Sequence, residues 1–354
     1  MKVCVYAICK NEEKFTERWY NSMKEADKIF VLDTDSKDNS VNKLKSLGVT
    51  VLQKEIKPWR FDEARNLSLD MVDSDADICV CTDLDEVFEK GWREKLENIW
   101  KEGTTRASYT YNWSLDDEGN PIVSFYSDKI HARKGYKWTH PVHEVLSYDK
   151  EEKRVFDENI VLNHYPDRQK SRSSYLPLLE LSVKEDPLDD RNMHYLGREY
   201  MYYGRWNDAI DTLIKHLNLE RATWKDERCA SMRFIGRCYK NLGRPLEAEM
   251  WYKKALLEAP HLKEAYTELA LFYYEEGKYE NAINLLNEAL KIKVGYKSYI
   301  TEWFSTDFNI YDVLSICYYK IGNYEKSLEC VDKALEITND QRLLKNKKII
   351  LKQM

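Results

Sequence analysis

Short apolar runs alternate with stretches of helical periodicity along the first part of the chain. Each run is rich in β-favouring residues, as expected for strands covered on both faces of a sheet. After the first run, Phe15, Trp19 and Met23 recur at helical spacing, which predicts an amphipathic helix that Asn11 can cap. Strands alternating with helices predict a largely parallel sheet with right-handed crossovers. The runs lie at 3–8, 29–32, 49–52 and 78–81.

A different pattern begins after residue 106. Apolar and polar residues alternate over 107–113 and again over 122–131, and the turn-forming sequence DDEGN separates the two segments. This arrangement predicts an antiparallel hairpin with Asp116 and Asp117 at its tip. A final strand is expected to end at His164, within the run IVLNHY at 160–165.

The second half of the chain contains four similar helical segments, beginning at Tyr195, Phe234, Glu268 and Val313. In each, a small residue is followed by a tyrosine, a glycine and a second small residue at fixed offsets. These offsets match the tetratricopeptide repeat, in which two antiparallel helices meet at small residues and turn at glycine. The first small residues and the glycines are Gly197, Gly236, Ala270 and Ser315, and Gly204, Gly243, Gly277 and Gly322.

These patterns predict two domains. The first, over 1–167, is an α/β domain with a mixed, mostly parallel sheet, and the second, over 168–354, is an all-α repeat solenoid. An insertion around 294–309 interrupts the repeats. It is rich in aromatic residues, namely Tyr296, Tyr299, Trp303 and Phe304, which can form an interface or pack inside the solenoid.

Composition narrows the class of protein. The formal net charge is −6, and 43% of the residues are hydrophobic, which excludes a disordered chain. Because neither half has an excess of basic residues, a nucleic-acid partner is disfavoured. No apolar run is long enough to span a membrane, and the acidic residues near the N-terminus do not fit a signal peptide. The eight cysteines lie mostly in apolar patterns, so we expect reduced core thiols and a cytoplasmic location.

Carboxylates follow two of the predicted strands. Asp83, Asp85 and Glu86 come directly after the run at 78–81, and Asp33 follows the run at 29–32. Parallel strands end at one edge of the sheet, where open α/β sheets bind ligands. Carboxylates there can hold a divalent cation, and the cation can hold the phosphates of a nucleotide.

Four motifs occur here in the order and approximate spacing of family 2 glycosyltransferases of the GT-A fold. They are AICKNEE, LDTDSKDNS, EARN and TDLDE, beginning at residues 7, 32, 63 and 82. The chain therefore resembles this family, and the resemblance implies a site for a nucleotide-diphosphate sugar with Mg²⁺ or Mn²⁺. One departure is Thr34 followed by Asp35, where the family often has aspartate or glycine directly after the first aspartate, and it weakens the inference about the base.

The resemblance also implies roles for single residues. Asp33 would approach the base, Arg65 the nucleotide or its phosphates, Asp83 the ribose and Asp85 the metal. In the first motif, Ala7, Cys9 and Asn11 would line the nucleotide site.

The acceptor side of such a domain is expected after the hairpin, within the run THPVHE at 139–144. An acidic residue there acts as a base in similar enzymes, which makes Glu144 the candidate, with Glu86 as the alternative. His164, at the end of the last strand, can complete the metal shell, and His143 is a further candidate ligand.

The predicted function is an inverting, metal-dependent hexosyltransferase that moves a sugar to a hydroxyl on a peptide, protein or glycan. A nucleotidyltransferase is one alternative, although AICKNEE lacks the glycines of a phosphate loop. A scaffold with an inert first domain is another, although that domain retains its carboxylates. The repeats could bind the acceptor, form a homodimer or brace the fold.

Overall fold

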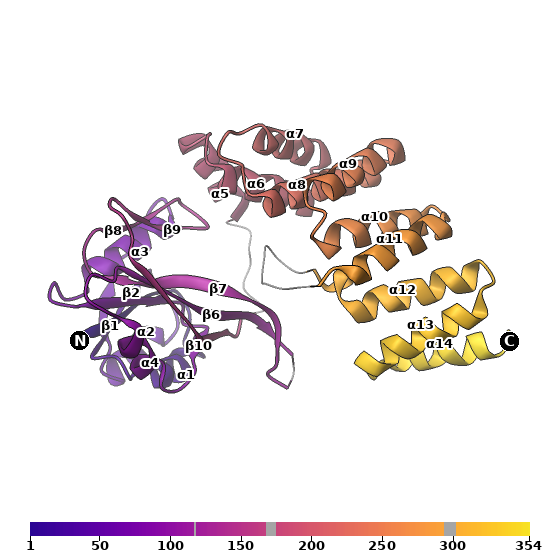
Figure 1. The fold of residues 1–354 in the computed structure, drawn as a ribbon. Helices are drawn as coiled ribbons and strands as arrows, with labels where there is room; N and C mark the ends of the chain where they lie inside the picture. Colours follow the sequence, from indigo (N-terminus) through magenta and orange to yellow (C-terminus); the bar gives the residue numbers. More distant parts are fainter. Residues whose placement is uncertain (117, 168–174, 294–301) are drawn as a thin grey trace. The chain divides into compact units, whose positions relative to one another are not determined.

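The computed structural model describes residues 1–116, 118–167, 175–293 and 302–354. The polypeptide divides into two compact units, residues 1–182 and 183–354. The first contains the strands and the second is helical (Figure 1). The predicted domain limit at 167 stays a prediction.

Within the described residues, the first unit is built on a mixed sheet of eight strands in the order β3-β2-β1-β4-β7-β6-β10-β5. The neighbours β3, β2, β1 and β4 run parallel, as the alternation of strands and helices predicts. Beyond β4 the sheet becomes mixed, because β7 pairs antiparallel with both β4 and β6 while β10 runs parallel to β6. The strands are β1 (Val3–Cys9), β2 (Lys28–Asp33), β3 (Thr50–Gln53), β4 (Ile78–Thr82), β5 (Glu86–Phe88), β6 (Arg106–Leu115), β7 (Pro121–Ala132) and β10 (Arg154–His164).

Alternating side chains of the central strands lie in two separate hydrophobic cores, one on each face of the sheet. On β1, Val3, Val5 and Ala7 face a core that includes Trp19 and Trp92, whereas Cys4 and Tyr6 face a second core. All five residues of β4 are buried, because both faces of this strand are covered. The helices of this unit are α1 (Thr16–Met23), α2 (Ser40–Ser46), α3 (Phe61–Asp70) and α4 (Trp92–Ile99).

A small antiparallel sheet supplies part of the second core. It consists of β8 (Tyr136–Thr139) and β9 (Val145–Tyr148), with Trp138 opposite Leu146. Tyr136, Trp138 and Leu146 are all buried in the core that also contains Tyr6. The second sheet therefore lies on the same face of the large sheet as Tyr6.

One expected helix cap is wrong. Asn11 does not cap α1, because that helix begins after Phe15 and Asn11 has a φ of +56°. Its side-chain oxygen instead accepts a hydrogen bond of 2.7 Å from the backbone N–H of Lys37, and its own N–H donates to Ser36. Asn11 thus fastens the loop after β1 to the loop after β2.

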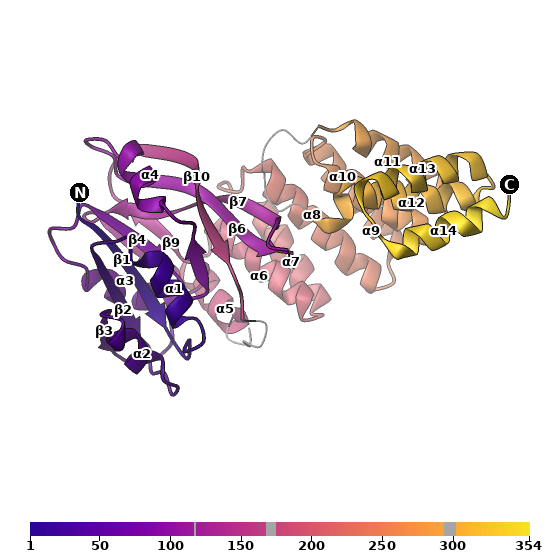
Figure 2. The same ribbon diagram turned by 90° about the horizontal axis from the view of Figure 1, so that it is seen from below.

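The second unit consists of antiparallel helix pairs that follow one another along the chain (Figure 2). Each pair is joined by a short turn whose glycine has a positive φ, for example +69° at Gly204 and +71° at Gly243. The helices are α5 (Tyr175–Glu185), which begins in the first unit, then α6 (Asp190–Tyr202), α7 (Trp206–Leu217), α8 (Lys225–Asn241), α9 (Pro245–Glu258), α10 (Lys263–Glu275), α11 (Tyr279–Lys291), α12 (Asp307–Lys320), α13 (Tyr324–Ile337) and α14 (Gln341–Leu351).

The small residues of the repeats lie where the paired helices touch. A Cβ added to Gly236 on α8 would lie 2.7 Å from Cε1 of Tyr252 on α9. A Cβ on Gly197 would lie 2.5 Å from Cγ of Leu213. Ala209, Ala248 and Ala282 are fully buried. The predicted helix contacts of the repeats are therefore confirmed.

The aromatic insertion is only partly described. Trp303 is 73% exposed, whereas Phe304 is buried. Glu302 forms ion pairs with Arg233 and with Arg237, 2.8 Å from Nη2 of the latter, and thereby fixes this end of the insertion to α8. Tyr296 and Tyr299 lie outside the described residues.

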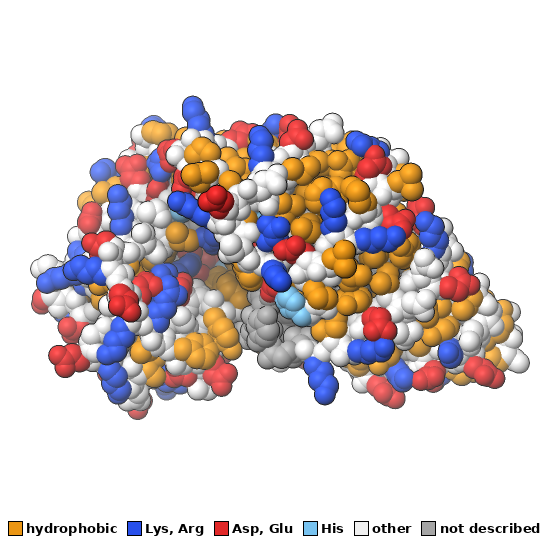
Figure 3. All heavy atoms as spheres, turned by 45° about the horizontal axis from the view of Figure 1, so that its top comes forward, with side chains coloured by type: hydrophobic (Ala, Val, Ile, Leu, Met, Phe, Trp, Pro, Cys, Tyr) orange, Lys and Arg blue, Asp and Glu red, His pale blue; other side chains and the backbone are white. Residues whose placement is uncertain are grey.

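All eight cysteines are buried free thiols, as predicted. Lysine and arginine side chains are interspersed with aspartate and glutamate on the face that Figure 3 shows. Among the described helices, none has the length and apolarity that crossing a lipid bilayer requires.

Candidate active site

The predicted site residues gather at the carboxyl edge of the central strands. Asp33 is the last residue of β2, and Asp83 and Asp85 follow β4. Arg65 reaches the same edge from α3, which runs between β3 and β4 in sequence. The chain thus places these groups together because parallel strands all end on one side of the sheet.

Arg65 is the centre of a buried ion-pair cluster. It is 3% exposed, and its Nη2 donates to Asp83 at 2.9 and 3.1 Å. Its Nε donates to Glu144, and its Cζ lies 5.2 Å from the ring centre of Trp138. Since two carboxylates and an indole surround the guanidinium, Arg65 orients Asp83 and Glu144 in this structure.

Lys129 adds a second cation to this cluster. Its Nζ lies 3.4 Å from Asp83 Oδ2 and 3.4 Å from Glu86 Oε1. The pairing of β6 with β7 shifts between Ala107 and Tyr109. Two residues of β7, Asp128 and Lys129, therefore lie opposite the single residue Ser108 of β6. Such a β-bulge changes the direction of a side chain, and here it turns Lys129 towards the carboxylates.

Glu86 is held from several sides and is 1% exposed. Its Oε2 accepts the backbone N–H of Asp83 at 2.8 Å, and its Oε1 accepts the hydroxyl of Tyr111 at 2.9 Å. Glu86 therefore fixes the loop that carries Asp83. Glu144, by contrast, uses only Oε1 in its contact with Arg65, and its Oε2 has no hydrogen bond with the described residues.

The charges of the cluster shift the pKa values in opposite directions. Burial alone would raise the pKa of Asp83, but Arg65 and Lys129 outweigh it and hold this pKa well below its ordinary value. Burial raises the pKa of Glu86, and the neighbouring Asp83 raises it further, against the opposite effect of Lys129. The carboxylate of Asp83 is thus ionised across the neutral range.

Asp85 and His164 form a separate pair beside this cluster. His164 Nε2 lies 3.4 Å from Asp85 Oδ2, and His164 Nδ1 lies 3.0 Å from the carbonyl oxygen of Trp113. Because a carbonyl only accepts, Nδ1 must carry a proton and donate it. Burial lowers the pKa of His164, but the hydrogen bonds to Asp85 and to the Trp113 carbonyl outweigh it and raise this pKa. The protonated ring donates to Asp85, whereas the neutral imidazole presents a lone pair at Nε2 to this carboxylate.

This arrangement fits a divalent cation. A metal-binding histidine commonly donates its other ring N–H to a backbone carbonyl, and a cation satisfies two facing acceptors. Among the described residues, no three or more His, Cys, Asp and Glu side chains converge as a metal-binding group. Mg²⁺ is nevertheless often held by one or two protein ligands, with phosphate and water completing its shell. Asp85 provides one such carboxylate, and His164 adds an imidazole nitrogen, a ligand that transition-metal ions accept more readily than Mg²⁺ does.

His143 is the candidate ligand that the described contacts do not place with this pair. Its ring centre lies 5.7 Å from that of Tyr175, at the start of α5. It has a φ of +50°, and His140 has a φ of +75°. Two residues other than glycine with positive φ mark a strained loop next to Glu144.

Asp33, the last residue of β2, is fully buried. Its Oδ1 accepts the backbone N–H of Ser36 at 3.1 Å, and its buried Oδ2 has no hydrogen-bond partner among the described residues. An unpartnered buried carboxylate oxygen is costly unless a ligand pairs with it. Ala7 and Cys9 belong to the core, and the carbonyl oxygen of Cys9 accepts hydrogen bonds from the N–H and the hydroxyl of Thr34. The predicted role of Ala7 and Cys9 stays a prediction.

A buried chain of hydrogen bonds supports Trp138 below Arg65. Trp138 Nε1 donates to the hydroxyl of Tyr6 at 2.8 Å, and this hydroxyl lies 2.7 Å from His131 Nε2. His131 Nδ1 lies 2.8 Å from the carbonyl oxygen of Ala132 and must donate to it, so Nε2 accepts from Tyr6. These contacts fix the indole on which the guanidinium rests.

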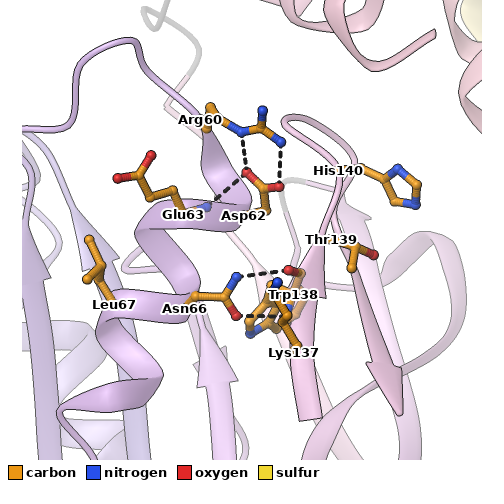
Figure 4. A pocket seen from close by; sticks show the side chains of 9 residues that line it. All are labelled: Arg60, Asp62, Glu63, Asn66, Leu67, Lys137, Trp138, Thr139 and His140. Atoms are coloured by element: carbon orange, nitrogen blue, oxygen red, sulfur yellow. Dashed lines mark hydrogen bonds and ion pairs between the residues drawn. The ribbon is translucent and has the colours of Figure 1, made fainter. Parts of the chain in front are cut away.

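Trp138 also lines a pocket of about 460 Å³ (Figure 4). Asn66 bonds the backbone of Trp138 through both atoms of its amide, at 2.8 and 2.9 Å, and so joins α3 to β8. Arg60 and Asp62, which also line the pocket, form a bidentate pair. The lining residues are Arg60, Asp62, Glu63, Asn66, Leu67, Lys137, Trp138, Thr139 and His140.

Sequence reasoning missed Lys129, Trp138 and Trp113 as residues of this region. Lys129 and Trp113 lie in strands whose alternating pattern gives no sign of a bulge, and only pairing with a neighbouring strand creates one. Trp138 lies directly before the run THPVHE, and this position was the one signal that could have singled it out.

A family model matches a part of each of the two units. The model of the glycosyl transferase family 2 matches residues 4–148. The tetratricopeptide-repeat model matches residues 234–261, 263–293 and 308–341. The human protein O-mannosyl-transferase TMTC1 is 39% identical over 59 residues, which are 17% of this chain and 7% of that protein.

Several solved structures resemble the repeat region. The MamA protein is 22% identical and covers 46% of this chain and 81% of its own, with a TM-score of 0.37. YrrB, described as a TPR protein with an unusual peptide-binding site, is 19% identical over 50% of this chain and 83% of its own (TM-score 0.38). TTC0263, a thermophilic TPR protein of Thermus thermophilus, is 20% identical over 51% of this chain and 90% of its own (TM-score 0.36).

Two family models thus match successive parts of the sequence, and the fold of each part agrees with the model that matches it. This chain contains a glycosyl transferase family 2 domain followed by tetratricopeptide repeats.

Proposed function

We propose that the protein is an inverting glycosyltransferase that uses a nucleotide-diphosphate sugar and a divalent cation. The observation that carries this proposal is the facing pair of Asp85 and His164, 3.4 Å apart, beside the Arg65–Asp83 cluster in a family 2 domain. A pair of acceptors next to ionised Asp83 suits a cation that binds a diphosphate.

Mn²⁺ or Mg²⁺ held by Asp85 and His164 would neutralise the charge that develops on the departing diphosphate. Asp33 has a buried oxygen without a hydrogen-bond partner among the described residues, and we propose that it binds the base of the nucleotide. Asp83 is assigned to the ribose, since Arg65 and Lys129 fix its carboxylate at the edge of the sheet. These assignments follow the order of the strands from β2 to β4.

Transfer to a hydroxyl requires a group that removes its proton. Glu144 suits this role better than Glu86, because its second oxygen has no partner among the described residues, whereas both oxygens of Glu86 accept hydrogen bonds. Arg65 orients the carboxylate of Glu144, and we assign the role of general base to Glu144. Glu86 is then a positioning residue for the loop of Asp83.

The acceptor is proposed to be a hydroxyl on a peptide, a protein or a glycan, and the protein is proposed to act in the cytoplasm. Tetratricopeptide repeats present an extended surface, which suits a macromolecular acceptor or a second copy of the chain. A sugar-transfer domain joined to such a surface would act on targets that the repeats retain nearby.

A screen of nucleotide sugars for hydrolysis tests the donor site, because water can replace the acceptor. The full chain is incubated with Mn²⁺ and each of a set of uridine, guanosine and thymidine diphosphate sugars, and free nucleoside diphosphate is measured. Hydrolysis that is lost with EDTA and in Asp85→Ala supports the proposal. A chain that hydrolyses and binds none of these compounds would be an inert scaffold.

The two carboxylates are compared once a donor and an acceptor are found. Glu144→Gln should lower transfer by about 100-fold or more while donor binding is retained, as expected for the loss of a general base. Normal transfer in Glu144→Gln together with lost transfer in Glu86→Gln would assign the base to Glu86.

A further inference from the structure

Trp113 stands out among the aromatic residues of β6 because it leaves the core. Tyr109 and Tyr111 on the same strand are 0% and 5% exposed, whereas Trp113 is 48% exposed. The pairing of β6 with β7 shifts between Asn112 and Ser114, which pair with Ser124 and Val123. Trp113 is thus the extra residue of a β-bulge, a feature that often directs a side chain at a functional site.

The exposed indole is held in a defined orientation next to the proposed metal ligands. Its ring centre lies 4.6 Å from that of His164, with an angle of 27° between the planes. The carbonyl of Trp113 also accepts the Nδ1 proton of His164, at 3.0 Å. One face of the indole is therefore occupied by the imidazole that faces Asp85, and much of the remaining ring is open to solvent.

Single exposed aromatic residues on a protein surface need no special explanation. Trp113 differs because its position is fixed by two contacts to a single residue of the site. Its indole N–H has no hydrogen-bond partner among the described residues. A fixed aromatic plane with a free donor at its edge suits a ligand that has both an apolar face and hydroxyl groups.

The order of the strands indicates which part of a nucleotide sugar would reach this ring. Asp33 lies at the end of β2, and β1, β4 and β7 separate β2 from β6 in the sheet. Four strand spacings of about 4.8 Å place the two strands about 19 Å apart. A base bound at Asp33 is thus far from Trp113, whereas groups beyond the diphosphate at Asp85 are near it.

We infer that Trp113 forms a saccharide subsite, in which its indole stacks on the C–H face of a pyranose ring beside the Asp85–His164 pair. This inference rests on the proposed function and adds the subsite that holds the sugar. The C–H groups of a pyranose carry partial positive charge and are attracted to the negative face of the indole. The pyranose can belong to the donor or to a glycan acceptor, and the experiment below separates these two sources.

The first measurement uses the full chain with Mn²⁺ and the variants Trp113→Ala and Trp113→Phe. Dissociation constants are determined for UDP and UDP-glucose, and for GDP and GDP-mannose. If the ring holds the donor sugar, Trp113→Ala should weaken the nucleotide sugar about fivefold more than the matching diphosphate, and Trp113→Phe should restore part of this difference. The ratio of the two constants is informative even if the variant also disturbs His164.

The second measurement uses methyl glucoside and methyl mannoside at millimolar concentration, with contacts detected by ligand-observed NMR. If the indole of Trp113 holds the acceptor, the NMR contacts of the glycosides should be lost in Trp113→Ala. The ratio of the dissociation constants of the nucleotide sugar and the diphosphate should then be the same in the wild type and in this variant. The control is Trp224→Ala, because Trp224 in the repeat unit is 49% exposed and so matches Trp113 in exposure. This control should change neither measurement.

The two proposals fail in different ways. A wild-type chain that binds no nucleotide contradicts the proposed transferase, while Trp113-dependent glycoside contacts still support the saccharide subsite. The inference is overturned if neither the ratio nor the glycoside contacts depend on Trp113, or if the wild type shows no saccharide contact at all. Melting temperatures of all variants identify any that are unfolded.

Discussion

Asp85 Oδ2 and His164 Nε2 face each other at 3.4 Å, although one residue follows β4 and the other ends β10. His164 donates its Nδ1 proton to the carbonyl oxygen of Trp113, so the neutral imidazole presents a lone pair at Nε2 to the carboxylate of Asp85. This relationship, rather than the acidic sequence TDLDE alone, defines the metal site that we propose.

Loss of either member of this pair should weaken metal-dependent nucleotide binding. We expect Asp85→Ala and His164→Ala each to weaken Mn²⁺-dependent binding of UDP or GDP at least about tenfold. A loss of about tenfold is the lower limit even for residues that only hydrogen-bond to a metal ligand, so loss of a ligand itself should cost at least as much. Calorimetric titrations with Mn²⁺ and with EDTA measure this effect. Asp149→Ala is the control, since Asp149 is an exposed carboxylate outside the proposed site. Equal binding by the wild type in EDTA would contradict the metal site.

Arg65→Met should destabilise the first unit, because it leaves Asp83 and Glu144 without the guanidinium that joins them. Removing one partner of a buried ion pair costs about 3 kcal/mol or more. Urea denaturation measures the loss, and Arg244→Met, which removes an exposed arginine, should have little effect. If Arg65→Met instead keeps its stability and loses only nucleotide binding, Arg65 acts directly on the phosphates, as the family resemblance implies.

His131 should make the stability depend on pH. Burial, together with the charges of Arg106 and Arg133, lowers its pKa to about 3, although its bond to the Ala132 carbonyl opposes this effect. In the unfolded chain the pKa is about 6.5. Between these values the unfolded state binds the extra proton, so the free energy of unfolding falls as the pH falls below about 6.5.

The expected loss from His131 alone is about 2 kcal/mol at pH 5. Unfolding free energies at pH 7 and pH 5 are compared for the wild type and His131→Asn, which keeps a donor and an acceptor but does not titrate. The variant should lose less stability over this interval. Identical losses in both proteins would show that His131 does not titrate differently on unfolding.

Gly236→Ala should destabilise the repeats, because its Cβ would lie 2.7 Å from the ring of Tyr252, which is 2% exposed. Overpacking of this kind costs about 1–3 kcal/mol, more than the better helix propensity of alanine gains. Ala270→Gly is the matched control at the equivalent repeat position, and it should cost about 1 kcal/mol or less through propensity. Thermal unfolding of both variants measures the difference. Unchanged stability in Gly236→Ala would mean that α8 and α9 can separate slightly without cost.

The local patterns of the sequence determined most of the fold. The apolar run at 78–81 is a strand buried on both faces, since hydrophobic residues without alternation fit only a sheet covered on both sides. The glycines at 204, 243, 277 and 322 all have positive φ, because a short turn between antiparallel helices needs a residue without a Cβ there. Such features depend on a few neighbouring residues, so the sequence states them directly.

The sequence also indicated which carboxylates belong to the site, because Asp33, Asp83 and Asp85 follow strands that end at one edge. It did not indicate how their charges are balanced. Arg65 lies in a motif that implies contact with a nucleotide, yet the folded chain surrounds it with Asp83, Glu144 and Trp138. That arrangement depends on packing between α3, β4 and the segment before β9.

Only the tertiary structure decided which residues outside the motifs reach the site. Lys129 and Trp113 lie in strands that read as ordinary alternating segments, and two bulges in the pairing of β6 and β7 turn them towards Asp83 and His164. A bulge arises from the register between two strands and has no signature in either strand alone. The sequence therefore determined the elements and the acidic edge, whereas strand register decided which side chains complete the site.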